Sequence, residues 1–127
     1  MPTVEIVFVV LLLHFTASSH GQTVNQPLAT ARTFQNILDT YAQQRKASIL
    51  GYHIVDEFVF EGCGVRLLKQ QFVNFLMTSN FRGVVIDARA DRNNVIYKMN
   101  YGPKKIEVTI RQLGNRHFLT KAKEIIC

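Results

Sequence analysis

The second half of the chain alternates between apolar and polar residues in four successive runs, and this pattern limits the fold more than any other feature. The runs are "VVIDARA", "VIYKMNY", "KIEVTIRQL" and "HFLTKAKEIIC". They are separated by "DRNN", "GPKK" and "GNR", which are rich in turn-forming residues. Alternation with a period of two is typical of strands that have one buried face. The pattern therefore predicts an antiparallel meander of four strands joined by short turns.

The same alternation predicts which face of the meander is buried. The apolar side of the first three runs is made by Val84, Ile86, Ala88 and Ala90, then Val95, Tyr97, Met99 and Tyr101, then Ile106, Val108 and Ile110. Asp87 and Arg89 fall on the opposite side of the first run, so we expect both to be exposed.

The first half of the chain has helical spacing instead. A helix is predicted from Leu28 to the polar residues 43–46, with its apolar face made by Leu28, Ala31, Phe34, Ile37, Leu38 and Tyr41. Its opposite, polar side is predicted to hold Gln35, Asp39 and Gln43. A short second helix is predicted over 47–55, then a strand in "DEFVFEGCG", then a third helix in "VRLLKQQFVNFLMTS". This order predicts an α+β domain, with three N-terminal helical segments packed on one face of a curved antiparallel sheet.

The N-terminus predicts export. Residues 6–15 are almost wholly apolar, too few to span a bilayer but of the length of a signal-peptide core, and small and polar residues follow. We expect a signal peptide over 1–21, a disordered leader over 22–27 and one domain over 28–127, without a membrane span. The expected localisation is secreted and extracellular.

The charge of the chain is basic. The formal net charge is +6, and loss of Glu5 with the signal would raise it to +7. A cationic surface can attract anionic glycans and membranes, but the basic residues are dispersed, and no nucleic acid partner is expected.

Two cysteines in an exported chain predict one disulfide, between Cys63 and Cys127. Cys63 stands between Gly62 and Gly64 at the end of the predicted strand. The alternative, a reactive thiol at Cys63, is less favoured, because a C-x-x-C partner is missing.

"FVFEGCG", the following "KQQFVNFL" and the C-terminal cysteine carry a resemblance to the nuclear transport factor 2-like domains, which have a cystatin-like fold. The pattern is similar to small secreted nematode members of this superfamily and covers Leu28 to Cys127; Val65-Arg66 departs from it. The resemblance implies a cone-shaped half-barrel with an apolar pocket between the concave sheet and the helices. A cystatin-like domain with a single helix is the alternative, and the two further helical segments count against it.

The resemblance also suggests site residues. Tyr97, Tyr101 and Met99 share one strand face and could line the pocket and contact a ligand, although core packing with the tyrosine hydroxyls at the rim is favoured. Ketosteroid-isomerase-like and polyketide-cyclase-like relatives can use a carboxylate near the start of the first strand as a general base, which makes Asp56 a candidate. His53 and His117 are isolated in the sequence, and neither a metal nor a cofactor is expected.

Three functions remain open at this point. The first is a secreted non-enzymatic domain that binds a small apolar ligand or a protein partner in or near its pocket. The second is attachment to an anionic surface such as a glycan. The third is an isomerase, cyclase or dehydratase that uses Asp56. A homodimer through the outer face of the sheet is a further hypothesis.

Overall fold

The computed structural model describes residues 26–127, so the predicted signal peptide and most of the predicted leader lie outside the described residues. The elements, in chain order, are α2 (Gln26–Gln43), α3 (Ala47–Tyr52), β1 (Ile54–Glu61), β2 (Arg66–Leu68), α4 (Lys69–Thr78), β3 (Gly83–Asp91), β4 (Asn94–Tyr101), β5 (Lys104–Leu113) and β6 (Arg116–Glu124). The predicted α+β order is confirmed, and α2 already includes Pro27, a residue that suits the first turn of a helix.

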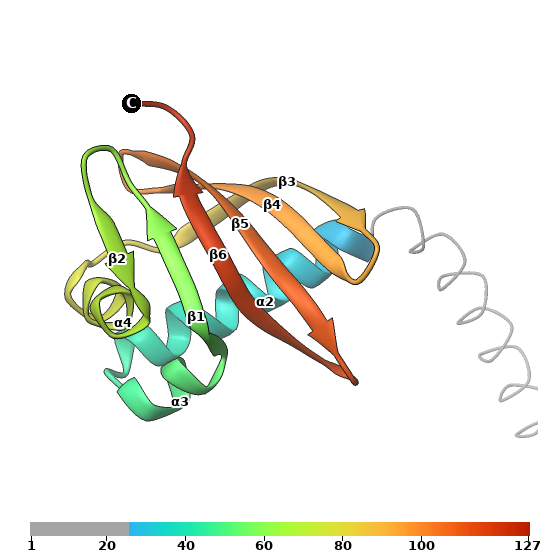
Figure 1. The fold of residues 1–127 in the computed structure, drawn as a ribbon, viewed down its shortest axis with the longest axis horizontal. Coiled ribbons are helices and arrows are strands. Elements are labelled where there is room, and N and C mark those ends of the chain that lie inside the picture. Colours follow the sequence, from blue (N-terminus) through green and yellow to red (C-terminus); the bar gives the residue numbers. More distant parts are fainter. Residues whose placement is uncertain (1–25) are drawn as a thin grey trace, which may run out of the picture.

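The six described strands form one curved sheet in the order β2-β1-β6-β5-β4-β3. Strands β3 to β6 form the predicted antiparallel meander, whereas β1 pairs in parallel with β6. Helix α2 crosses one face of the sheet, where it contacts β3 and β4, and α3 and α4 lie beside β1 and β2 (Figure 1). The sheet is open, and its inner face and the helices enclose the core.

Aromatic side chains fill the end of the core under α4. Phe72 lies 4.7 Å from Phe58 and 5.5 Å from Phe60 between ring centroids, and Phe75 lies 5.8 Å from Tyr101. Phe58 and Phe60 are 1% and 2% exposed. Burial of these aromatic rings contributes favourable free energy to the folding of the domain.

The predicted third helix begins later than expected. Residues 66–68 form β2, which pairs with β1, and α4 begins at Lys69. Leu68 is therefore 55% exposed and is not part of the helical face. Its backbone N–H donates to Gln71 Oε1 at 2.9 Å, which satisfies one of the unpaired donors at the start of α4.

The predicted inner face of β3 is wrong. Val84 and Ile86 are 62% and 49% exposed, whereas Val85 is buried. Val85 pairs directly with Met99, and paired residues of adjacent strands point to the same face. The register shifts between Val85 and Asp87, where a β-bulge adds one residue and changes the alternation. Ala88 packs against the core, Ala90 is exposed, and the predicted exposure of Asp87 and Arg89 is confirmed.

The predicted polar side of α2 is also wrong at two positions. Gln35 and Asp39 are 2% and 5% exposed, and they lie in the buried stripe with Phe34 and Leu38. The helix is rotated so that this stripe faces β3 and β4, and Ile37 is left half-buried at its edge. Burial of the two polar groups is tolerated because each is hydrogen-bonded, as described below.

The disulfide between Cys63 and Cys127 is confirmed, with 5.5 Å between the two Cα atoms. It ties the turn after β1 to the end of the chain. Gly64 has a φ of +78°, which favours glycine, and a Cβ on Gly62 would lie 2.6 Å from Val65 Cγ1. Beneath the bridge, the Glu124 carboxylate accepts hydrogen bonds from the Cys63 N–H and from Lys104 Nζ, each at 3.2 Å.

Candidate functional site

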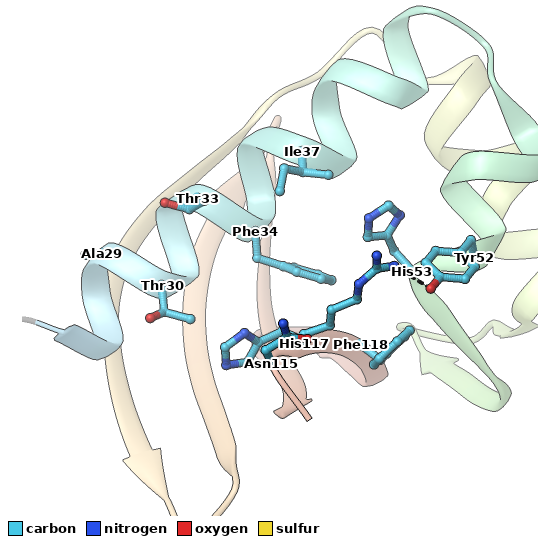
Figure 2. A pocket seen from close by; sticks show the side chains of 11 residues that line it. Ala29, Thr30, Thr33, Phe34, Ile37, Tyr52, His53, Asn115, His117 and Phe118 are labelled. Atoms are coloured by element: carbon cyan, nitrogen blue, oxygen red, sulfur yellow. Dashed lines mark hydrogen bonds between the residues drawn. The ribbon is translucent and has the colours of Figure 1, made fainter. Parts of the chain in front are cut away.

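A groove of about 500 Å³ opens between the first half of α2, the junction of α3 with β1, and the start of β6 (Figure 2). We call it the α2–β6 groove. It is lined by Ala29, Thr30, Thr33, Phe34, Ile37, Tyr52, His53, Asn115, Arg116, His117 and Phe118. Its volume falls within the ~300–1,000 Å³ that is common for small-molecule sites.

The walls of the groove are apolar and aromatic. Phe34 and Ile37 project from α2, and Phe118 faces them from β6 (Figure 2). The Tyr52 and Phe118 rings meet edge to face, with 6.0 Å between their centroids. Phe34 is 4% exposed and joins the groove floor to the core. A ligand with apolar surface would replace water along these walls, which is favourable.

The backbone fixes the position of His53 and of β6. The N–H of Leu119 donates to the His53 carbonyl at 2.8 Å, so the α3–β1 junction is held against the start of β6. His53 Nδ1 lies 2.9 Å from the Ile49 carbonyl oxygen. Because a carbonyl oxygen only accepts, Nδ1 is the donor of this hydrogen bond. The imidazole also stacks on Tyr41, with 5.8 Å between ring centroids.

Arg116 supplies a positive charge whose position is set by contacts with Tyr52. Its guanidinium donates a hydrogen bond to the Tyr52 hydroxyl and lies 5.5 Å from the centre of the Tyr52 ring. Within residues 26–127, Arg116 forms no ion pair with a carboxylate.

Burial lowers the pKa of His117 below its ordinary value of 6.5, so this imidazole is mainly neutral at neutral pH.

Tyr97, Met99 and Tyr101, the predicted ligand-binding residues, lie in the core. They are 0%, 3% and 1% exposed, and none of them lines the α2–β6 groove. The Tyr101 hydroxyl lies 2.5 Å from Ser79 Oγ, and burial raises the pKa of Tyr101. Their burial corresponds to core packing, the favoured interpretation of these residues, and ligand contact through them stays a prediction.

A buried polar chain joins α2, β3 and β4. The Tyr97 hydroxyl donates to Gln35 Oε1 at 2.8 Å, and Gln35 Nε2 donates to Asp39 Oδ1 at 2.9 Å. The Gly83 N–H donates to Asp39 Oδ2 at 3.0 Å. Burial raises the pKa of Asp39 above 3.8, and the hydrogen bonds from Gln35 and Gly83 and the charge of Arg82 partly oppose this. Burial, together with the negative charge of Asp39, raises the pKa of Tyr97 well above 10.0.

Asp56 lies in open solvent. Its side chain is 95% exposed, and it pairs with Lys69 Nζ at 3.0 Å. It does not line the α2–β6 groove. A general base needs to reach a bound substrate and gains its tuned pKa from a partly dry site, so this position gives Asp56 no support as a catalytic group.

The described part of the chain has neither a metal-ligand cluster nor a helix suited to cross a membrane. No three histidine, cysteine, aspartate or glutamate side chains gather there in a way that could hold a metal ion. None of the helices from Gln26 onward has the length and apolar character needed to cross a membrane. The predicted homodimer and the predicted attachment to anionic surfaces stay predictions.

The residues of the groove could not have been identified by local spacing. His53 and His117 looked isolated in the sequence, and Arg116 looked like one residue of a turn. They line the same groove because the backbone N–H of Leu119 on β6 is hydrogen-bonded to the His53 carbonyl, a long-range contact. The one local signal is the "GNRHF" turn, where Gly114 has a φ of +66° and two basic residues precede Phe118.

Comparison with solved structures identifies the fold. An NTF2-like protein of unknown function from Silicibacter pomeroyi has a TM-score of 0.63 at 7% identity, over 82% of this chain and 98% of that chain. An NTF2-like protein with a cystatin-like fold from Novosphingobium aromaticivorans has a TM-score of 0.59 at 8% identity, over 84% and 85%. A SnoaL-like protein of unknown function from Burkholderia thailandensis has a TM-score of 0.54 at 14% identity, over 78% and 96%.

These likenesses confirm that the chain has the nuclear transport factor 2-like, cystatin-like fold. No known sequence family matches the chain, and no curated protein sequence does. At such low identities the solved structures show the fold alone, and the resemblance to secreted nematode members stays a prediction.

Proposed function

We propose that the protein is a secreted, non-enzymatic domain that binds a small apolar ligand in the α2–β6 groove. The observation that carries the proposal is the groove itself, with a volume of about 500 Å³ and with Phe34, Tyr52 and Phe118 in its walls. Sites of this kind are concave and mostly apolar, with a few polar groups that orient the ligand. His53, Asn115 and Arg116 are such polar groups here.

Secretion is supported by two independent features. The apolar run at residues 6–15 has the length of a signal-peptide core. The Cys63–Cys127 disulfide is typical of proteins that fold in oxidising compartments.

The absence of an enzymatic role is part of the proposal. It is supported by the position of Asp56, whose carboxylate is 95% exposed and paired with Lys69 rather than directed at the groove. His53 is engaged through Nδ1 with the Ile49 carbonyl. Among the described lining residues, none is an aspartate, glutamate, serine or cysteine that could form a pair with either histidine.

The proposal can be tested with the neutral fluorescent probe N-phenyl-1-naphthylamine. We expect the mature protein to bind it with a rise in fluorescence, and Thr33→Trp to reduce this binding at least tenfold, because an indole at this exposed lining position would fill the groove. Arg32→Trp is the matched control, since Arg32 is exposed on the same helix and does not line the groove.

Two results would count against the proposal. The first is the absence of any fluorescence rise with the wild-type protein. The second is binding by Thr33→Trp that equals binding by Arg32→Trp, which would place the probe elsewhere on the surface.

A further inference from the structure

The α2–β6 groove carries positive charge and no negative charge among its described lining residues. Arg116 carries a positive charge, and among the described residues that line the groove none is acidic. The nearest partner of the guanidinium is the uncharged Tyr52 hydroxyl. The four described ion pairs involve Arg66, Lys69, Lys104 and Lys123, and not Arg116.

The guanidinium is also held in place. One N–H is fixed by the Tyr52 hydroxyl, and the cation lies over the Tyr52 ring at 5.5 Å from its centre. Tyr52, which is 55% exposed, in turn makes edge contacts with His53 and Phe118, at 5.6 and 6.0 Å between ring centroids. An arginine keeps five N–H donors in a planar fork, so the remaining donors are available to a ligand at one side of an apolar groove.

On the basis of the proposed function, we infer that the ligand is an apolar molecule with a single carboxylate. Arg116 binds this carboxylate. Phe34, Ile37 and Phe118 contact the apolar body of the ligand. A carboxylate matches the guanidinium fork in shape and in charge. A phosphate monoester carries roughly −1.5 to −2 charges at neutral pH, and one arginine would leave much of that charge uncompensated. His117 is mainly neutral under these conditions and supplies no full second charge.

Further polar side chains line the groove. Asn115 belongs to the turn before Arg116, and Thr30 and Thr33 lie on α2 (Figure 2). These groups can donate hydrogen bonds to polar atoms of a ligand or to bridging water. The groove therefore combines apolar walls with polar groups, which suits an amphipathic ligand.

The test compares ligands that share one apolar chain. Decanoate, 1-decanol and decyl phosphate are used to displace N-phenyl-1-naphthylamine from the wild-type protein, from Arg116→Gln and from Arg89→Gln. Arg89→Gln is the control, because it removes the same charge from an exposed position on β3, outside the groove. We expect wild type to bind decanoate about tenfold or more tightly than 1-decanol, as charge-assisted hydrogen bonds imply. Arg116→Gln should lose that preference, and Arg89→Gln should keep it.

The outcomes separate this inference from the proposed function. The inferred carboxylate contact with Arg116 is overturned if decanoate and 1-decanol displace the probe equally, or if the two variants bind decanoate equally. The groove then remains an apolar binding site. Tighter binding of decyl phosphate than of decanoate overturns the choice of carboxylate. Failure of the wild-type protein to bind the neutral probe at all overturns both proposals.

Discussion

The Tyr97 hydroxyl on β4 donates a hydrogen bond of 2.8 Å to Gln35 Oε1 on α2, and these side chains are 0% and 2% exposed. The bond therefore joins the helix to the sheet inside the core. Tyr97→Phe would leave Gln35 Oε1 buried without a donor, so we expect a loss of about 1–3 kcal/mol in the free energy of unfolding. Urea denaturation measures it.

The matched control is Tyr101→Phe. The hydroxyl of Tyr101 bonds to the half-buried Ser79, where water can replace it, so the expected loss is smaller. If Tyr97→Phe were no less stable than wild type, the buried polar chain would not contribute to the stability of the fold.

The second prediction concerns the pH dependence of stability. The pKa of Asp39 is raised in the folded state, so in the pH window between its ordinary pKa and its folded pKa the folded chain binds more protons than the unfolded chain. Wild type should therefore gain stability relative to Asp39→Asn as the pH falls from neutral through the folded pKa of Asp39. Urea denaturation of both proteins at several pH values measures the difference.

Asp87→Asn is the control for this prediction, because Asp87 is exposed on β3. Its stability relative to wild type should show no such gain on acidification. A loss of wild-type stability relative to Asp39→Asn over the same window would show that the hydrogen bonds from Gln35 and Gly83 outweigh the effect of burial.

The third prediction concerns the disulfide. Cys63 and Cys127 are separated by 64 positions, and the chain-entropy relation assigns a loop of that size about 4 kcal/mol of stabilisation. We expect the double variant Cys63→Ser/Cys127→Ser to lose about that amount in the free energy of unfolding, measured in denaturant. Wild type kept in a reducing agent should unfold at the same denaturant concentration as the variant. A loss below about 1 kcal/mol would contradict the chain-entropy account.

The fourth prediction compares two glycines. A Cβ on Gly83 would lie 2.6 Å from Met99 Sδ and 2.7 Å from two carbons of Gln35. Gly83→Ala should therefore cost about 1–3 kcal/mol through overpacking, and it should disturb the N–H bond to Asp39. Gly51→Ala should be neutral or slightly stabilising, because Gly51 lies in α3 and its nearest neighbour would be 3.6 Å away. Thermal unfolding of both variants tests this contrast.

The sequence predicted the elements better than it predicted their faces. The meander could be predicted from the alternation of apolar and polar residues, which is a local pattern. The disulfide could be predicted because the chain has only two cysteines. The buried side of β3 depends on the pairing of Val85 with Met99 and on the bulge beside it, which alternation alone does not reveal. The burial of Gln35 and Asp39 depends on partners from β3 and β4, and an amphipathic pattern assigns such polar residues to the solvent side.

The groove was the least predictable part. The resemblance implied an apolar pocket between the concave sheet and the helices, but the tyrosines chosen for it, Tyr97 and Tyr101, fill the core. The lining residues instead come from α2, the α3–β1 junction and β6, whose contact is made by tertiary structure. Tyr52 and Arg116 are 64 positions apart, and nothing in either local sequence relates them.

The parallel pairing of β1 with β6 has a consequence for the order of folding. Val59 of β1 lies beside Lys121 of β6, so this side of β1 stays unpaired until nearly all of the described chain has been synthesised. The pairings among β3, β4, β5 and β6 join only strands that are neighbours in sequence and can form early, whereas closure of the long loop between β1 and β6 is slow. We therefore expect β1, β2 and α4 to dock last on a preformed meander. Since the cysteines join the same two distant regions, their oxidation would mark the completion of folding.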